Sequence, residues 1–154
     1  MIILAAITGG SFTIWLVPQT TQTKFVISDA KENLDEIIER QKTVSDSISE
    51  ELAGMLNNQI TPDDYINIAQ ISSSQVNSFI ITIIQSDVPE EWRESYSAYT
   101  DFLRAYNSYL QETIVIANKL KENSGADIAK DKTKIDSMLN DANMIADASL
   151  KARP

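Results

Sequence analysis

The sequence predicts an all-α protein, in which an N-terminal transmembrane helix is followed by an up-down-up-down antiparallel four-helix bundle. Two observations carry this prediction. The first 17 residues hold no charged side chain and end at Pro18. In the rest of the chain, apolar residues recur at alternating spacings of four and three, which is typical of the buried face of helices in a left-handed bundle.

Residues 1–18 are interpreted as a membrane anchor. A helix rises 1.5 Å per residue, so the uncharged run covers about 25 Å, slightly less than a hydrocarbon core of about 30 Å. The run has neither the basic start nor the small-residue cleavage site of a secretory signal peptide. The alternative is a buried core helix, but such a helix is seldom apolar all round and placed at a chain end.

Small residues of the anchor are expected to pack against another membrane helix. Ala5 with Gly9, and Ala6 with Gly10, form two overlapping small-xxx-small spacings that let a second helix approach closely. Trp15 suits the interface between membrane and water. The expected partners are therefore membrane lipid and other transmembrane subunits of a membrane complex.

The orientation of the anchor is weakly encoded. Lys24 and Lys31 are the basic residues nearest the span, and by the positive-inside rule they favour a cytoplasmic bundle. They lie among Asp29 and Glu32, however, and the count changes if the natural chain extends before Met1. We expect a single-pass membrane protein whose soluble domain is extracytoplasmic.

After a short connector at 19–22, the domain of residues 23–154 is expected to hold four helices. The first covers about 23–57 and the second 62–85. Thr61 can cap the second helix, whose first turn contains a proline and two aspartates that favour the positive end of the helix dipole. The expected buried faces are Ala30, Leu34, Ile37, Gln41, Val44, Ile48, Leu52 and Met55, then Tyr65, Ala69, Ser72, Val76, Phe79 and Ile83.

The third helix is expected at about 89–123 and the fourth at about 126–152. Ser86 or Asp87 can cap the third, and Asn123-Ser124-Gly125 is typical of its C-terminal cap. Short loops between long helices require antiparallel neighbours. The expected buried faces are Trp92, Tyr96, Tyr99, Leu103, Tyr106, Leu110, Ile114 and Ala117, then Ile128, Ile135, Met138, Ala142, Ile145 and Ala148.

Composition excludes most catalytic chemistry. The chain has no histidine, which rules out serine-histidine triads, Glu-x-x-His di-iron sites and histidine-bound zinc. Its net charge of −9 repels nucleic acid. The adjacent acidic pairs lie near helix ends, where the dipole explains them. We expect no enzyme activity, no catalytic or metal-binding residues, no cofactor, no nucleic-acid partner and no small-molecule substrate.

Two further patterns have structural interpretations. The tyrosines between residues 96 and 109 could form a stacking surface for a ligand, but their spacing favours core packing. Acidic residues between 46 and 64 are expected to face the lysines of residues 119–134 across the distal end of the bundle, where opposite charges would set the helix register.

The second bundle helix has an unusual composition, because residues 65–86 hold no charged side chain. A solvated helix face normally carries lysine and glutamate. Burial against a partner is one interpretation, and a modestly polar helix with an exposed isoleucine or two is the other. The expected partner interface consists of Asn67, Gln70, Ser74, Asn77, Ile80, Ile81, Ile84 and Trp92.

These features favour a non-catalytic, single-pass accessory subunit of a larger membrane protein complex, which docks through its anchor and its uncharged second bundle helix. The alternative follows from a resemblance. A membrane helix leading into a bundle of this length resembles the four-helix extracytoplasmic domains of chemoreceptors, which implies a ligand-binding sensory function. The chain departs from that pattern because Ala152-Arg153-Pro154 ends it without a second span.

Overall fold

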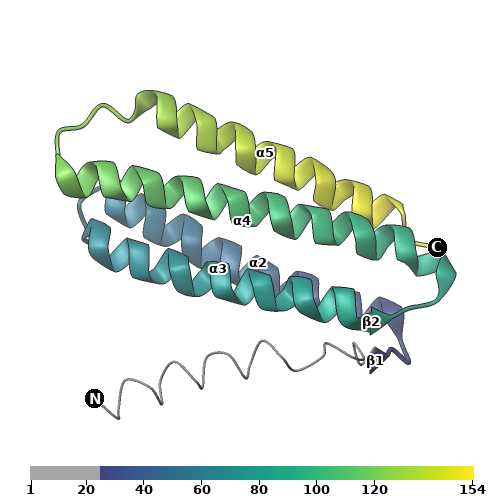
Figure 1. Ribbon diagram of the computed structural model, residues 1–154. Helices are drawn as coiled ribbons and strands as arrows, with labels where there is room; N and C mark the ends of the chain where they lie inside the picture. The colour runs from purple at the N-terminus through teal and green to yellow at the C-terminus, as the bar shows by residue number, and fades with distance from the viewer. Residues whose placement is uncertain (1–24) are drawn as a thin grey trace, which may run out of the picture.

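The computed structural model describes residues 25–154, which form four long helices packed as a bundle (Figure 1). Successive helices run in opposite directions, and the predicted all-helical fold is confirmed for this part of the chain. Two short strands pair with each other, and a 3-10 turn precedes the third bundle helix. The elements are β1 (Phe25–Val26), α2 (Ala30–Leu56), α3 (Pro62–Gln85), β2 (Ser86–Asp87), η1 (Glu90–Trp92), α4 (Arg93–Glu122) and α5 (Ala129–Lys151).

The predicted anchor at 1–18 and the connector at 19–22 lie outside the described residues. So do the residues expected to pack in the anchor, which are Ala5, Ala6, Gly9, Gly10 and Trp15. Within residues 25–154, no helix combines the length and the apolar character needed to cross a membrane.

The start of α3 is as predicted, whereas α2 begins later than the expected residue 23. Thr61 caps α3, because its hydroxyl accepts a hydrogen bond from the Asp64 N–H at 3.1 Å. The carboxylate of Asp29 does the same for the Glu32 N–H at 2.9 Å, so α2 begins at Ala30. The residues just before this cap form β1 instead of a further helical turn.

The end of α2 is a Schellman motif built on asparagine. Asn58 has φ 58°, and it is the one non-glycine residue with positive φ in the part of the chain described. The N–H of Gln59 donates to the Gly54 carbonyl at 2.8 Å, and that of Asn58 donates to the Met55 carbonyl at 3.0 Å. Asparagine tolerates this left-handed conformation better than most residues do, which allows the chain to turn sharply into α3.

The predicted start of α4 needs correction, whereas α4 ends at Glu122 with Asn123 as its C-cap, as predicted. Ser86 and Asp87 do not cap the start of α4, because they pair in parallel with Phe25 and Val26, and α4 begins only at Arg93 after the η1 turn. At the other end, no glycine within residues 25–154 has positive φ. The turn after α4 instead uses the Asn123 side chain, which accepts a hydrogen bond from the Gly125 N–H at 3.1 Å.

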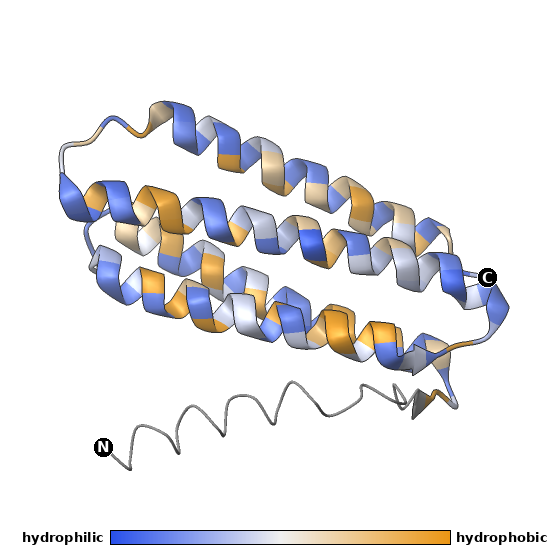
Figure 2. Cartoon of the chain, in the orientation of Figure 1, coloured by the Kyte–Doolittle hydropathy of each residue, from blue (hydrophilic) through white to orange (hydrophobic). Residues whose placement is uncertain are grey.

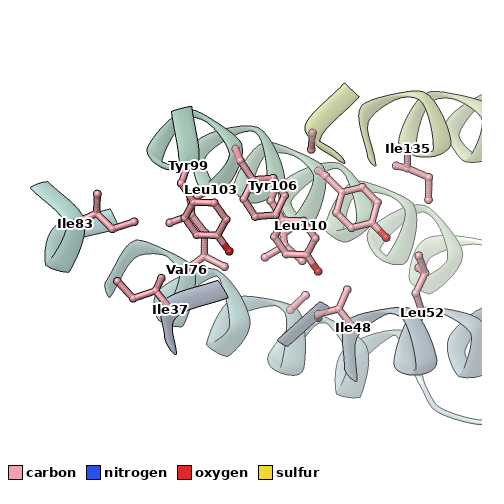
Figure 3. Packing of buried hydrophobic residues seen from close by; sticks show 14 of the residues in the cluster. Ile37, Ile48, Leu52, Val76, Ile83, Tyr99, Leu103, Tyr106, Leu110 and Ile135 are labelled. Carbon is pink, nitrogen blue, oxygen red and sulfur yellow. The ribbon is translucent and has the colours of Figure 1, made fainter. Parts of the chain in front are cut away.

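The core lies along the predicted faces, and α4 contacts all three other bundle helices. Most residues expected inside are buried, while Val44, Phe79, Trp92, Ile114, Ile128, Met138 and Ile145 are half-buried against the same cluster. Ala148 is exposed, contrary to prediction, because the buried face of α5 continues from Ala142 to Ser149. Figure 3 shows four of the α4 side chains that point towards α2 and α3, namely Tyr99, Leu103, Tyr106 and Leu110.

All five tyrosines of the chain are buried, which confirms core packing over a surface for stacking. Two of their hydroxyls have partners on other helices. Tyr65 donates to the Thr113 hydroxyl at 2.7 Å, and Tyr96 donates to the Ala30 carbonyl at 2.8 Å. These bonds join α3 to α4 and α4 to α2, since a buried phenol must find a partner inside the protein.

A reciprocal serine pair holds α4 against α5. The Ser95 hydroxyl donates to the Ser149 carbonyl at 2.9 Å, and the Ser149 hydroxyl donates to the Ser95 carbonyl at 2.8 Å. Both residues are fully buried. Small side chains allow the two helices to approach closely at the end where β1 and β2 lie.

The expected charge pairing across the distal end is present at one position. Lys121 on α4 forms an ion pair with Asp63 on α3, with Nζ and Oδ1 2.5 Å apart. Lys119 and Lys134 instead form pairs between α4 and α5, with Asp131 at 2.7 Å and Glu112 at 2.6 Å. The lysines of this end therefore connect α4 to both of its neighbours in sequence.

Buried tyrosines predict alkaline unfolding. Burial raises the pKa of Tyr96 and of Tyr106 to about 12, from an ordinary value near 10. Their contribution to stability is complete below about pH 10 and is lost as the pH rises to about 12. The reason is that these phenols lose their protons at a lower pH in the unfolded chain than in the folded one. In an alkaline titration, the loss of the helical signal in circular dichroism and the rise of tyrosinate absorbance should therefore occur over the same pH range.

The Tyr106→Phe variant provides a control. Removing the Tyr106 hydroxyl leaves the aromatic ring in the core, so the substitution should preserve the fold and shift the alkaline transition upward. Tyrosinate absorbance that rises near pH 10 while the helical signal stays intact would contradict this account.

Candidate partner-binding surface on α3

The outer face of α3 is the part of the surface with the most unusual composition. It consists of the exposed residues of the helix after its first turn, none of which is charged. The other three bundle helices expose lysines, aspartates and glutamates along their length. We call this surface the α3 outer face, and it is made of Asn67, Gln70, Ile71, Ser74, Gln75, Asn77, Ser78, Ile81, Thr82 and Ile84.

Three large apolar side chains stand out from this face. Ile71 is 61% exposed, Ile81 is 54% exposed and Ile84 is 46% exposed. Two of them lie in the final turns of α3, where hydrophobic residues follow one another almost without interruption next to β2 (Figure 2). Complete burial of a fully exposed isoleucine contributes about 1.5–3 kcal/mol, and since these side chains are already partly covered, a partner would add about half of that for each one.

The structure separates the residues of the expected interface into two groups. Six are exposed on the α3 outer face: Asn67, Gln70, Ser74, Asn77, Ile81 and Ile84. Ile80 and Trp92 are half-buried and pack against the core, so they are less available to a partner than the other six. Ile71 was absent from the expected set, although it lies one helical turn from Asn67 and Ser74 and could have been found from that spacing.

Hydrogen bonds hold one edge of this face in place. The Asn107 amide on α4 donates to the Asn77 side chain at 3.2 Å. The Ser73 hydroxyl donates to the Asn107 side chain at 2.6 Å and accepts from the Gln111 amide at 3.2 Å. These uncharged bonds fix α3 against α4 where ion pairs could otherwise have formed.

A groove of about 530 Å³ lies between α2 and α3, beside the α3 outer face. Gln75 and Ser78 belong to both surfaces. The rest of the groove is lined mainly by hydroxyl groups and by Val44 and Phe79, and its one charged lining residue is Arg40. Since Arg40 already forms an ion pair with Glu36, the groove offers uncharged hydrogen-bonding groups beside apolar ones.

The strand pairing places the beginning of the described chain at the apolar end of α3. Phe25 pairs with Ser86 and Val26 with Asp87, and the Ile27 N–H donates to the Asp87 carbonyl at 3.3 Å. Figure 1 shows β1 and β2 together at the end where α3 stops and α4 begins. The chain that precedes β1 is thus connected to the bundle beside the exposed isoleucine Ile84.

Within residues 25–154, no three acidic, histidine or cysteine side chains are arranged to hold a metal ion. In comparisons with known proteins, the chain matches no protein-family model, no curated protein and no solved structure.

Proposed function

We propose that this protein is a non-catalytic, single-pass accessory subunit of a membrane protein complex. Its N-terminal segment attaches it to the membrane, and its α3 outer face docks on another subunit. The observation that carries the proposal is a helix that has no charge over residues 65–86 and yet exposes three isoleucines, in a chain with net charge −9.

The contrast with the other helices supports burial of this face. A helix face in water is normally kept soluble by lysine, glutamate and aspartate, which are costly to bury without partners. Residues 43–92 contain no lysine or arginine. None of the acidic residues in that range lies in α3 beyond the first turn of the helix. A face without charge does not lower solubility where a partner covers it. Docking of such a face also requires no desolvation of charged side chains.

The position of β1 supports a membrane-proximal interface. The uncharged run of residues 1–17 precedes β1, and β1 pairs beside Ile84 at the end of α3. A membrane anchor formed by that run would leave the apolar end of α3 close to the bilayer, within reach of a transmembrane subunit.

The charges at this end favour a protein partner over lipid. Asp87, Glu90 and Glu91 are all exposed beside the apolar end of α3. Carboxylates are repelled by anionic headgroups, whose negative surface potential attracts basic segments instead. The α3 outer face is therefore suited to an uncharged protein surface, with its isoleucines at the centre and its asparagines, glutamines and serines at the rim.

Charge substitutions on this face should release the partner. We expect that the full chain, purified from its own membranes in mild detergent, brings down at least one other subunit. The Ile81→Glu and Ile84→Glu double variant should lose most of it, because each substitution removes an apolar contact and buries an unpaired carboxylate.

Met144→Glu and Val115→Glu form the matched control. Both residues are exposed apolar positions, 58% on α5 and 43% on α4, and the charge change is the same. These variants should retain the partner, and circular dichroism should show that all four substitutions leave the bundle folded. Recovery of the chain alone, or equal loss in both pairs, would contradict the proposal.

The proposed extracytoplasmic orientation has a separate test. The chain has no cysteine, so Ser124→Cys creates a single thiol in the exposed loop between α4 and α5. A maleimide that cannot cross membranes should label this thiol in intact cells as fully as in lysed cells. Labelling only after lysis would place the bundle on the cytoplasmic side.

A further inference from the structure

The direction of β1 determines the side from which the N-terminal part of the chain enters the bundle. β1 and β2 run parallel, with Phe25 opposite Ser86, and β2 follows directly on Gln85, the last residue of α3. In a parallel pair, the chain segments that lead into the two strands come from the same side. The chain therefore enters β1 from the side of α3, next to the apolar end of that helix.

The exposed isoleucines of the α3 outer face lie within reach of the uncharged run. Ile71 and Ile84 are about 20 Å apart along α3, at 1.5 Å per residue. The run of residues 1–17 covers about 25 Å as a helix. Residues 18–24 connect it to β1 and extend over at most about 25 Å. The run is long enough to cover the isoleucines, and the connection is long enough to bring it alongside them.

The run and the α3 outer face have matching compositions. The run places aliphatic residues beside Thr8, Ser11 and Thr13, and it has no charge. The α3 outer face likewise places isoleucines beside uncharged amides and hydroxyls. Contact between them buries aliphatic side chains against each other, allows hydroxyl groups to pair with amides, and desolvates no charge. Gly9 and Gly10 have no side chain to hold the two segments apart.

The covalent connection favours this segment over a separate molecule. A short linker gives the segment that it tethers an effective concentration on the order of millimolar. A second copy of the chain, or another protein, must reach the same face from a far lower concentration in dilute solution. Outside the membrane, the run is therefore the favoured occupant of the α3 outer face.

We infer that the uncharged N-terminal run covers the α3 outer face while the chain is outside the membrane, and that insertion of the run into the bilayer exposes this face to its partner. The inference rests on the proposed function, since it concerns the same anchor and the same docking surface. The run cannot occupy the bilayer and α3 at once, so insertion and docking are coupled. The chain then binds its partner only where both are in the membrane.

Quenching of a bimane label by Trp15 tests the covered state in the full chain. The chain has two tryptophans and no cysteine, so Trp92→Phe leaves Trp15 as the single tryptophan. Gln70→Cys or Ser74→Cys then gives a single thiol on the α3 outer face. Indole quenches bimane only at short range. In buffer without lipid or detergent, a label at one of these two positions should lose most of its emission, and Trp15→Phe should restore it.

Controls separate this contact from others, in variants whose circular dichroism matches that of the natural chain. A label on Met144→Cys, at an exposed apolar position of α5, should be equally bright with and without Trp15. A labelled chain that carries Trp15→Phe, mixed with unlabelled chain that keeps Trp15, should stay bright, because the contact is within one molecule. Reconstitution into phosphatidylcholine vesicles should restore emission at α3, because the run then lies in the bilayer.

The inference is wrong if neither α3 position shows quenching that depends on Trp15, if the α5 position is quenched equally, or if quenching arises between chains in the mixture. It is also wrong if quenching persists in vesicles, or if the full chain aggregates in buffer because both apolar surfaces stay exposed.

These results are independent of the pull-down with Ile81→Glu and Ile84→Glu. Bright labels in buffer, together with release of the partner by those substitutions, would refute the covered state alone. Quenched labels in buffer, together with recovery of the chain alone from its own membranes, would support the covered state and refute the accessory role.

Discussion

The buried seam of α4 is the constraint on which the rest of the bundle depends. Leu103 and Leu110 are fully buried, and the tyrosines beside them reach across to the other helices. The hydroxyl of Tyr96 ends on α2, while that of Tyr65 ends on Thr113 of α4. Because α4 packs extensively on both α3 and α5 and also touches α2, its length and its periodicity constrain where the other helices can lie.

This arrangement leaves a cleft between helices and the α3 outer face at the surface of the bundle. α2 packs mainly on α3, and α5 packs mainly on α4, so the cleft beside Gln41 lies where α2 and α5 face each other across α4. The α3 outer face is the side of α3 that points away from the core. This face exposes isoleucines and carries no charge, and it is the surface for which we propose a protein partner.

Periodicity predicted most of the bundle, because a continuous apolar face leaves a repeated signal in the sequence. The faces of α2, α3 and α4 were found from spacing alone, down to a glutamine at a core position.

The strand pair was not predicted, since Phe25–Val26 and Ser86–Asp87 are too short to show alternation and depend on a contact distant in sequence. Asn123-Ser124-Gly125 correctly marked the end of α4, where the Asn123 side chain closes the turn by accepting a hydrogen bond from the Gly125 N–H. The cleft between α2, α4 and α5 depends on the packing of three helices, which no local sequence pattern shows.

The central claim is that the α3 outer face is covered by another protein in the membrane. The most direct measurement is site-specific photo-crosslinking in intact membranes, with a benzophenone side chain placed at position 81 on α3 or, for comparison, at position 144 on α5. Position 81 should yield a discrete cross-linked product with one membrane protein, and position 144 should yield none. Cross-linking only to lipid at position 81, or the same product from both positions, would contradict it.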